Sequence, residues 1–162
     1  MKETQDSVTL TPCAAGRFFA SDFLPLIIES NDILHNTFGK SLLQRSDITE
    51  EDIRRYVRDF RTIRLSMGQR MGHTHAVIAL AKPGDLVVGL DDRMTLWVAS
   101  DTGAGIEFMT RNMLMSEIEW GLSPKGHPTI WLMDFSRWPR TSLNAIRERL
   151  IKNGDQRMII LG

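Results

Sequence analysis

The stretch Met94-Thr95-Leu96-Trp97-Val98-Ala99-Ser100, followed by Asp101-Thr102-Gly103-Ala104-Gly105, decides the predicted fold. Its first seven residues are rich in β-branched and aromatic side chains, which favours a strand. The two glycines that follow predict a tight turn. Glycine lets the backbone approach a ligand closely, and the free N–H groups at the start of a helix attract anions. A strand, a glycine turn and a helix in this order indicate an anion site, although a plain turn or a tight helix start explains the glycines equally well.

The segments after this turn alternate between helical and extended patterns. Residues 106–120 are apolar-rich and predict a helix, and residues 129–135 predict a strand. Residues 142–152 predict a second helix that ends at Asn153-Gly154, and residues 156–161 predict a last short strand. Because the strand at 129–135 follows a helix, it needs a crossover connection and can run parallel to its neighbour.

The N-terminal part of the chain carries weaker signals. Residues 8–11 alternate and predict a short strand, whereas residues 17–30 have apolar side chains at helical spacing. Pro25 lies inside that helix and predicts a kink or an early first turn. Residues 31–45 are mixed in character and predict a loop with short helical pieces at most.

A clear helix start follows at Thr49, which can cap the helix, with Asp52 three residues later as a variant of the capping box. The predicted helix ends by Gly68 or Gly72. Its apolar stripe consists of Ile53, Tyr56, Val57, Phe60 and Ile63. Arginines occupy much of the remaining surface between residues 54 and 64, but acidic residues alternate with them, so an ion-paired face is favoured over a nucleic-acid interface.

Three strand-like runs, at residues 76–80, 86–90 and 94–100, are joined by short turns and predict an antiparallel meander. Together with the later strands they predict an α+β fold, in which a twisted mixed sheet of about six to seven strands is flanked by about four helices. The 162 residues are expected to form a single domain, residues 1–162.

Composition narrows the class of protein. The chain is 42% hydrophobic and 25% charged, which is ordinary for a globular protein, and its 20 basic residues balance 20 acidic ones. Zero net charge gives no general reason to expect nucleic acid or an anionic membrane as a partner. Cys13 is the single cysteine, so no internal disulfide can form. The polar N-terminus has no signal-peptide pattern, and no apolar run is long enough to span a bilayer, so a cytoplasmic protein is expected.

The order of elements resembles the GNAT superfamily of acyl-CoA-dependent N-acyltransferases. The signature of that family, Arg or Gln, two residues, Gly, one residue, then Gly or Ala, falls on Ser100-Asp101-Thr102-Gly103-Ala104-Gly105. Both glycines match, but Ser100 replaces the Arg or Gln. The run Asn144-Ala145-Ile146, with the helix end at Asn153-Gly154, is similar to the family's last helix. The paired runs 96–101 and 131–134 also resemble the GNAT-like proteins of short-tailed phages, for which the host cytoplasm is the expected location.

The resemblance implies acetyl-CoA or another acyl-CoA as cofactor and an amine acceptor, either a small molecule or a protein lysine or N-terminus. The residues that it implies for the cofactor are Val98, Ser100, Gly103, Ala104, Gly105, Ile106 and Asn144. Asp134, Ser136 and Ser142 are the catalytic candidates, as a base or as donors to a leaving thiolate. A loop cap explains Asp134 equally, and capping of the last helix is favoured for Ser142 or Thr141.

Two further observations bear on function. The family often has a Tyr general acid on its last helix, where this chain has Leu150, and the single tyrosine is Tyr56. This absence favours a rival reading, a non-catalytic GNAT-like phage protein for virion assembly or host interaction; a homodimer is compatible with either reading. His73 and His75 would share one face of a strand, but no nearby carboxylate or Cys completes a ligand set, so no metal site is predicted.

Overall fold

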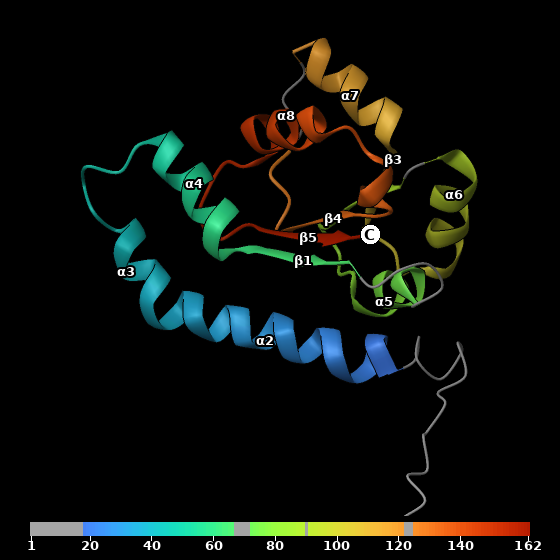
Figure 1. The fold of residues 1–162 in the computed structure, drawn as a ribbon, viewed down its shortest axis with the longest axis horizontal. Helices are drawn as coiled ribbons and strands as arrows, with labels where there is room; N and C mark the ends of the chain where they lie inside the picture. The colour runs from blue at the N-terminus through green and yellow to red at the C-terminus, as the bar shows by residue number, and fades with distance from the viewer. Residues whose placement is uncertain (1–17, 67–71, 90, 122–124) are drawn as a thin grey trace, which may run out of the picture.

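A parallel sheet lies at the centre of the protein (Figure 1). The computed structural model describes residues 18–66, 72–89, 91–121 and 125–162. Within them the strands are β1 (Thr62–Leu65), β2 (Leu86–Gly89), β3 (Glu107–Thr110), β4 (Thr129–Leu132) and β5 (Arg157–Leu161). The five strands lie in the order β1-β5-β4-β2-β3, and every pairing between them is parallel. In the described part of the chain, the protein is therefore a mixed helical and β protein with one parallel sheet.

Helices cover both faces of the sheet. On one face α4 (Glu50–Phe60), α7 (Arg111–Glu119) and α8 (Arg140–Leu150) pack against alternate strand residues such as Leu86 and Val88. On the other face lie α5 (His73–Leu80), α6 (Asp92–Asp101) and a long helical segment. That segment joins η1 (Phe19–Phe23), α2 (Leu24–Leu34), η2 (His35–Gly39) and α3 (Lys40–Leu43).

The strands are apolar on both sides because both faces are covered. All four residues of β2 and all four of β4 are buried. Val87 and Trp131 contribute to the cluster under α5 and α6, while Leu86, Val88 and Ile130 contribute to the cluster under α7 and α8. Continuous burial of this kind is what a parallel sheet between two helical layers requires.

The connections turn in opposite directions from two adjacent strands. The chain leaves β2 for α6 on one face and leaves β4 for α8 on the other face. Because β2 and β4 are neighbours, the loops after them diverge at the carboxyl edge of the sheet. Such a switch point is where open sheets of this kind usually bind ligands.

Several local predictions are confirmed. Thr49 caps α4 with its hydroxyl 3.2 Å from the Asp52 amide, and the Asp52 carboxylate lies 3.1 Å from the Thr49 amide. Strands at β2, β4 and β5 and a helix at α8 were all expected, and β4 pairs in parallel as a crossover requires.

Two predicted strands of the meander are helices. Residues 76–80 belong to α5, and residues 94–100 belong to α6. In α6, Thr95 and Val98 are buried three residues apart, which is a helical spacing. A short apolar run has the same composition in a buried strand and in a buried helix, so periodicity alone could not separate them. The predicted antiparallel meander is therefore wrong.

Other boundaries also differ from expectation. The segment 106–120 divides into β3 and α7, with Thr110 capping α7 through a 3.2 Å bond from the Met113 amide. The helix after Thr49 ends at Phe60, and β1 follows where the helix was expected to continue. Residues 31–43 are helical instead of a loop. The described sheet has five strands instead of six to seven, and more than four helices surround it. The predicted strand at 8–11 lies outside the described residues.

Candidate functional site at the carboxyl edge of the sheet

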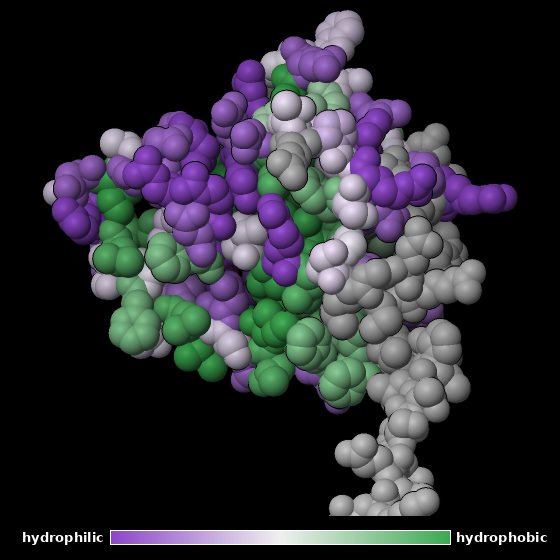
Figure 2. All heavy atoms as spheres, in the orientation of Figure 1, coloured by the Kyte–Doolittle hydropathy of each residue, from purple (hydrophilic) through white to green (hydrophobic). Residues whose placement is uncertain are grey.

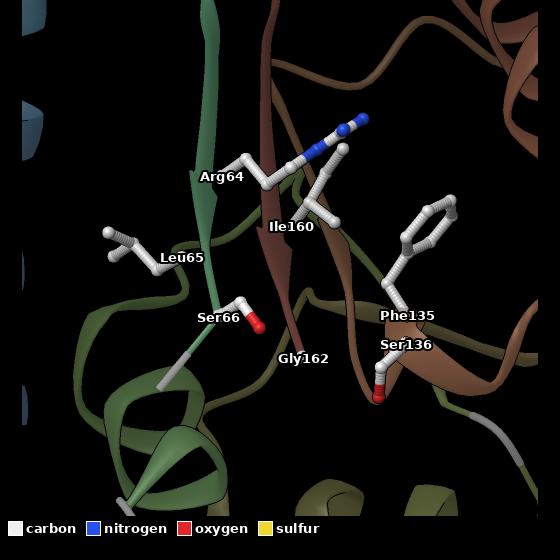
Figure 3. Close-up of a pocket in the computed structure, with 7 residues that line it drawn as sticks. All are labelled: Arg64, Leu65, Ser66, Phe135, Ser136, Ile160 and Gly162. Carbon is white, nitrogen blue, oxygen red and sulfur yellow. The ribbon is translucent and has the colours of Figure 1, made fainter. Parts of the chain in front are cut away.

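A small cavity lies where β1 and β5 end beside the loop after β4 (Figure 3). Its volume is about 150 Å³. It is lined by Arg64, Leu65, Ser66, Phe135, Ser136, Ile160 and Gly162. The side chains of Ser66 and Ser136 supply two hydroxyl groups at the rim, and Arg64 supplies a guanidinium group that extends from β1. The cavity therefore combines hydrogen-bond donors with one positive charge.

Asp134 shapes the loop that forms one wall. Its backbone has φ 51°, the one positive φ angle of a non-glycine residue in the described ranges. Left-handed backbone at a residue with a Cβ costs free energy, and such residues are enriched at functional sites. The turn at Asp134 starts the short helix η3 (Phe135–Arg137), which brings Phe135 and Ser136 to the cavity.

Arg64 links this cavity to a positively charged cluster. Its guanidinium carbon lies 5.9 Å from the ring centre of Phe135, a cation–π geometry. Burial lowers the pKa of Arg147 on α8, and the charges of Arg64 and Arg58 lower the same pKa further. The charges of Arg64 and Arg58 thus both act on Arg147.

The cluster has little compensating negative charge. Asp59 acts in the opposite direction on Arg147, but its carboxylate already binds Arg58 at 2.7 Å. Arg147 Nε is buried without a hydrogen-bond partner, and among the described residues no carboxylate lies within ion-pair distance of Arg147. A half-buried guanidinium without a counter-ion is costly, so this surface has a physical preference for an anion.

His73 lies near the same edge, as the first residue of α5. Burial lowers its pKa, while the negative charge of Asp134 acts to raise it, which also places the two residues near each other. Nε2 of His73 is buried without a partner, and the ring contacts Phe19 edge-on at 5.5 Å between centres. The ring is therefore held in its neutral form near neutral pH. His75 does not share its face as predicted, because residues two apart point in different directions on a helix.

The structure places two of the three catalytic candidates at this edge. Asp134 and Ser136 belong to the loop after β4. Ser142 lies in the first turn of α8, where it is buried. The expectation that Ser142 or Thr141 caps α8 is wrong, because Pro139 is the N-cap residue and no side chain caps this helix.

The residues predicted for the cofactor lie elsewhere. Val98 is buried on α6 and Ser100 is on its exposed side, while Asn144 is exposed on α8. Gly103, Ala104, Gly105 and Ile106 connect α6 to β3.

The glycine turn therefore lies at the amino edge of the sheet, because it precedes a strand. Gly105 has φ 87°, and its carbonyl accepts a 2.7 Å bond from the Gly84 amide. No helix starts at this turn, so the helix-dipole reason for a diphosphate at Gly103 and Gly105 is absent. The structure does not bring the predicted cofactor residues together with Asp134 and Ser136, which lie at the opposite edge.

A charged network at the amino edge was not predicted. Asp32 of α2 accepts hydrogen bonds from Arg61 at 2.9 Å and from Arg157 at 2.8 Å. Burial opposes the charge on Asp32, but these bonds and the two positive charges outweigh it and lower the pKa of the carboxyl group. Next to this network lies a cavity of about 340 Å³, lined partly by Asp85, Trp131 and Arg157. Because Arg61 and Arg157 both bind Asp32, the network ties α2 to the sheet.

A buried histidine was also missed. His35 Nδ1 lies 2.8 Å from the Tyr56 hydroxyl, and its Nε2 lies 2.9 Å from the Asp155 carboxylate. The sequence predicted a loop at residues 31–45, which contains His35, so the burial of His35 was not expected. The one available signal was the apolar stripe that contains Tyr56, which indicated that Tyr56 itself is buried.

Three of the five arginines in residues 54–64 are ion-paired, whereas Arg55 and Arg64 have no ion pair among the described residues. Arg54 lies within 3.4 Å of both Glu50 and Glu51, and Arg61 is buried against Asp32. An ion-paired surface was the favoured reading of this segment, and the contacts agree with it.

Comparison of the chain with protein-family models, with curated proteins and with solved structures finds no match. In the described ranges no cluster of His, Cys, Asp or Glu has the arrangement of a metal site. The helices described here are too short or too polar to cross a lipid bilayer. The chemistry of the site must therefore be argued from its own residues.

Proposed function

We propose that the protein binds a small anionic ligand, a phosphate or carboxylate compound, at the carboxyl edge of the sheet. The observation that carries the proposal is the half-buried guanidinium of Arg147, whose Nε has no hydrogen-bond partner and whose charge is opposed by Arg64. Arg64 lines the cavity and also acts on Arg147, so it connects the two features of this surface.

A phosphate-bearing acyl donor is the member of this ligand class that the GNAT resemblance favours. Asp134 and Ser136 remain the catalytic candidates in that reaction, with Asp134 as the base that accepts the proton of an amine nucleophile. The cofactor's phosphates would then contact Arg64 and Arg147 instead of the glycine turn. Acyl transfer is a narrower proposal than anion binding, and it can fail while anion binding stands.

Calorimetric titration with pyrophosphate tests anion binding, and titration with acetyl-CoA tests binding of the acyl donor. The Arg64→Gln variant is expected to weaken binding about tenfold, since hydrogen bonds to charged groups contribute about 1.5–3 kcal/mol. Arg149→Gln is the matched control, because Arg149 is exposed near the end of α8, the helix that carries Arg147. Higher salt should weaken binding.

The outcomes distinguish anion binding from acyl transfer. Binding of both ligands that is weakened about tenfold in Arg64→Gln and unchanged in Arg149→Gln supports the anion site. Acetyl transfer to an amine that is lost in Asp134→Asn would support the acyltransferase. Absence of any heat or melting shift with either ligand at millimolar concentration would refute the proposal as a whole.

A further inference from the structure

The cavity of about 340 Å³ lies at the amino edge of the sheet, opposite the proposed anion site. It is lined by Thr129 and Arg157, the first residues of β4 and β5, and by Asp85, which directly precedes β2. Side chains of α2 and of the end of α5 also line it. Ligand pockets usually have volumes of about 300–1,000 Å³, so this cavity is large enough for a small organic molecule.

The carboxylate of Asp85 is buried beside this cavity, with only 3% of the residue exposed. Its Oδ2 atom accepts two hydrogen bonds, one of 3.1 Å from the Trp131 indole N–H and one of 2.9 Å from the Lys82 amide. Both donors are neutral. Within the described ranges, Oδ1 accepts no hydrogen bond and no cationic side chain lies within ion-pair distance of Asp85. A buried negative charge is costly unless it is paired, so Asp85 favours a positively charged partner.

The two cationic side chains that line the cavity do not supply this partner. Arg157 is directed to other acceptors, since it binds Asp32 at 2.8 Å and the Thr129 hydroxyl at 3.3 Å. Lys82 is exposed, and its ammonium group forms no ion pair with a described residue. A cation from solution can therefore take the place beside the buried carboxylate.

The cavity also offers an apolar surface. Hydrophobic residues gather over α2 in the space-filling view (Figure 2), and Pro25 and Ile28 of this helix line the cavity. Leu80 of α5 and Trp131 of β4 add further apolar atoms. Burial of apolar ligand surface against these side chains is favourable. The cavity thus combines one buried negative charge with an apolar wall, which suits a cation that has a hydrocarbon body.

The helical segment on one side of the cavity contains an irregular stretch. Asn36 lines the cavity from η2, which is π-helical. Turns of π-helix are rare and occur frequently at functional sites. The same stretch is fixed to the protein by His35, which is buried against Tyr56. This observation does not depend on charge, and it supports a binding role for the side of the segment that faces the cavity.

We propose that the amino-edge cavity binds a small organic ammonium compound, a primary amine with an apolar body. The ammonium group pairs with Asp85, and the exposed Glu29 adds a second negative charge to the lining. The hydrocarbon part packs against Pro25, Ile28 and Leu80. This site differs from the proposed anion site in both position and charge, so either one can fail while the other stands.

NMR spectroscopy of the Trp131 indole N–H group tests the proposal, because this group donates to Asp85. Phenethylammonium is the probe, and the Trp131→Phe variant assigns the signal. A saturable shift of this signal is expected as the probe is raised to millimolar concentration. The neutral analogue 2-phenylethanol and the anion 3-phenylpropionate are similar in size and should bind at least about tenfold more weakly. Absence of a shift, or equal binding of the three compounds, overturns the proposal.

Variants that replace a carboxylate by an amide locate the charge that binds the probe. Asp85→Asn should weaken binding of phenethylammonium about tenfold. Glu29→Gln changes an exposed residue and should weaken it about two- to fivefold. Glu119→Gln is the matched control and should leave binding unchanged, because Glu119 is exposed on α7, which covers the other face of the sheet. Binding that Asp85→Asn leaves intact overturns the proposal; if that variant does not fold, unchanged binding in Glu29→Gln overturns it.

Discussion

Gly39 lies directly beneath the hydroxyl group of Tyr56, so that a Cβ atom on Gly39 would overlap this oxygen. The contact joins η2 to α4 at the place where His35 also binds the Tyr56 hydroxyl. This close approach is one of the contacts that hold the helical segment Phe19–Leu43 against α4. The contact is possible only because Gly39 has no side chain.

Replacing Gly39 by Ala is therefore expected to lower the free energy of unfolding. The added methyl group must displace Tyr56 or the helix, and overpacking of this kind costs about 1–3 kcal/mol. Chemical denaturation measures the change. Gly103→Ala is the matched control, because no atom lies within 4 Å of a Cβ built there. Adding Tyr56→Phe should recover part of the loss in Gly39→Ala, and equal stability of both alanine variants would contradict the close contact.

Asp32 is expected to make the protein less stable in acid. Its pKa is lower in the folded protein than in the unfolded chain, so the carboxylate contributes stability above the unfolded value of 3.8. This contribution is lost as the pH falls from that value through the folded pKa. Asp32→Asn should remove the pH dependence in this window, as measured by urea unfolding at several pH values.

The same Asp32→Asn variant should lose about 1–2 kcal/mol near neutral pH, because the buried Arg61 loses its charged partner. Asp47→Asn serves as the control, since Asp47 and Arg45 form an exposed pair whose side chains are 66% and 64% accessible. Exposed pairs contribute less than about 1 kcal/mol. A similar loss of unfolding free energy in both variants would show that the Asp32 network contributes no more stability than an exposed ion pair.

His73 predicts a second pH effect, in a different range. Because burial lowers its pKa in the folded protein, the unfolded chain takes up a proton first as the pH falls. Stability should therefore decrease below the ordinary histidine value of 6.5. The NMR signal of the His73 ring should titrate below that value, and His73→Gln should reduce the loss of stability between pH 7 and pH 5. An unshifted titration would place the ring in solvent.

The N-terminal caps of α4 and α8 offer a direct comparison. Thr49→Ala removes a capping box and should cost about 1 kcal/mol of unfolding free energy. Thr141→Ala should have little effect, because no side chain caps α8. Thermal and chemical denaturation of the two variants check this difference. Equal losses would indicate that Thr141 caps α8 after all.

Local signals in the sequence were sufficient for some elements. Thr49 and Asp52 are three residues apart, and their capping box depends only on backbone that they share. The strand at β4 and the helix at α8 were recognisable because length, flanking breakers and periodicity agreed. These features required no knowledge of distant residues.

Other elements could not be separated by local pattern. Val98 and Ile130 both stand in short apolar runs and both are fully buried, yet one lies on a helix and the other on a strand. The difference depends on which neighbour each run packs against, and that neighbour is distant in sequence. The expectation of an antiparallel meander failed for this reason, and the position of the glycine turn changed with it.

The candidate site also combines residues that local sequence signals indicated with residues that only distant contacts bring together. Asp134 was a candidate because it lies where the predicted strand ends, and the structure places it and Ser136 at a carboxyl edge. Arg64 was read as part of a helical face, and its proximity to Arg147 depends on how β1 and α8 come together. Nothing local indicates that two arginines so far apart in the chain will share one surface.

By itself, the sequence determined the capping box of α4, the strands β2, β4 and β5 and the helix α8, because the signals for these elements act over a few residues. Only the tertiary structure decided that all the described strands run parallel, that Asp32 binds Arg157 across 125 residues, and that the charge of Arg64 acts on Arg147. Burial, charge repulsion and unpaired donors arise from contacts between distant segments, and those contacts exist only once the sheet has assembled.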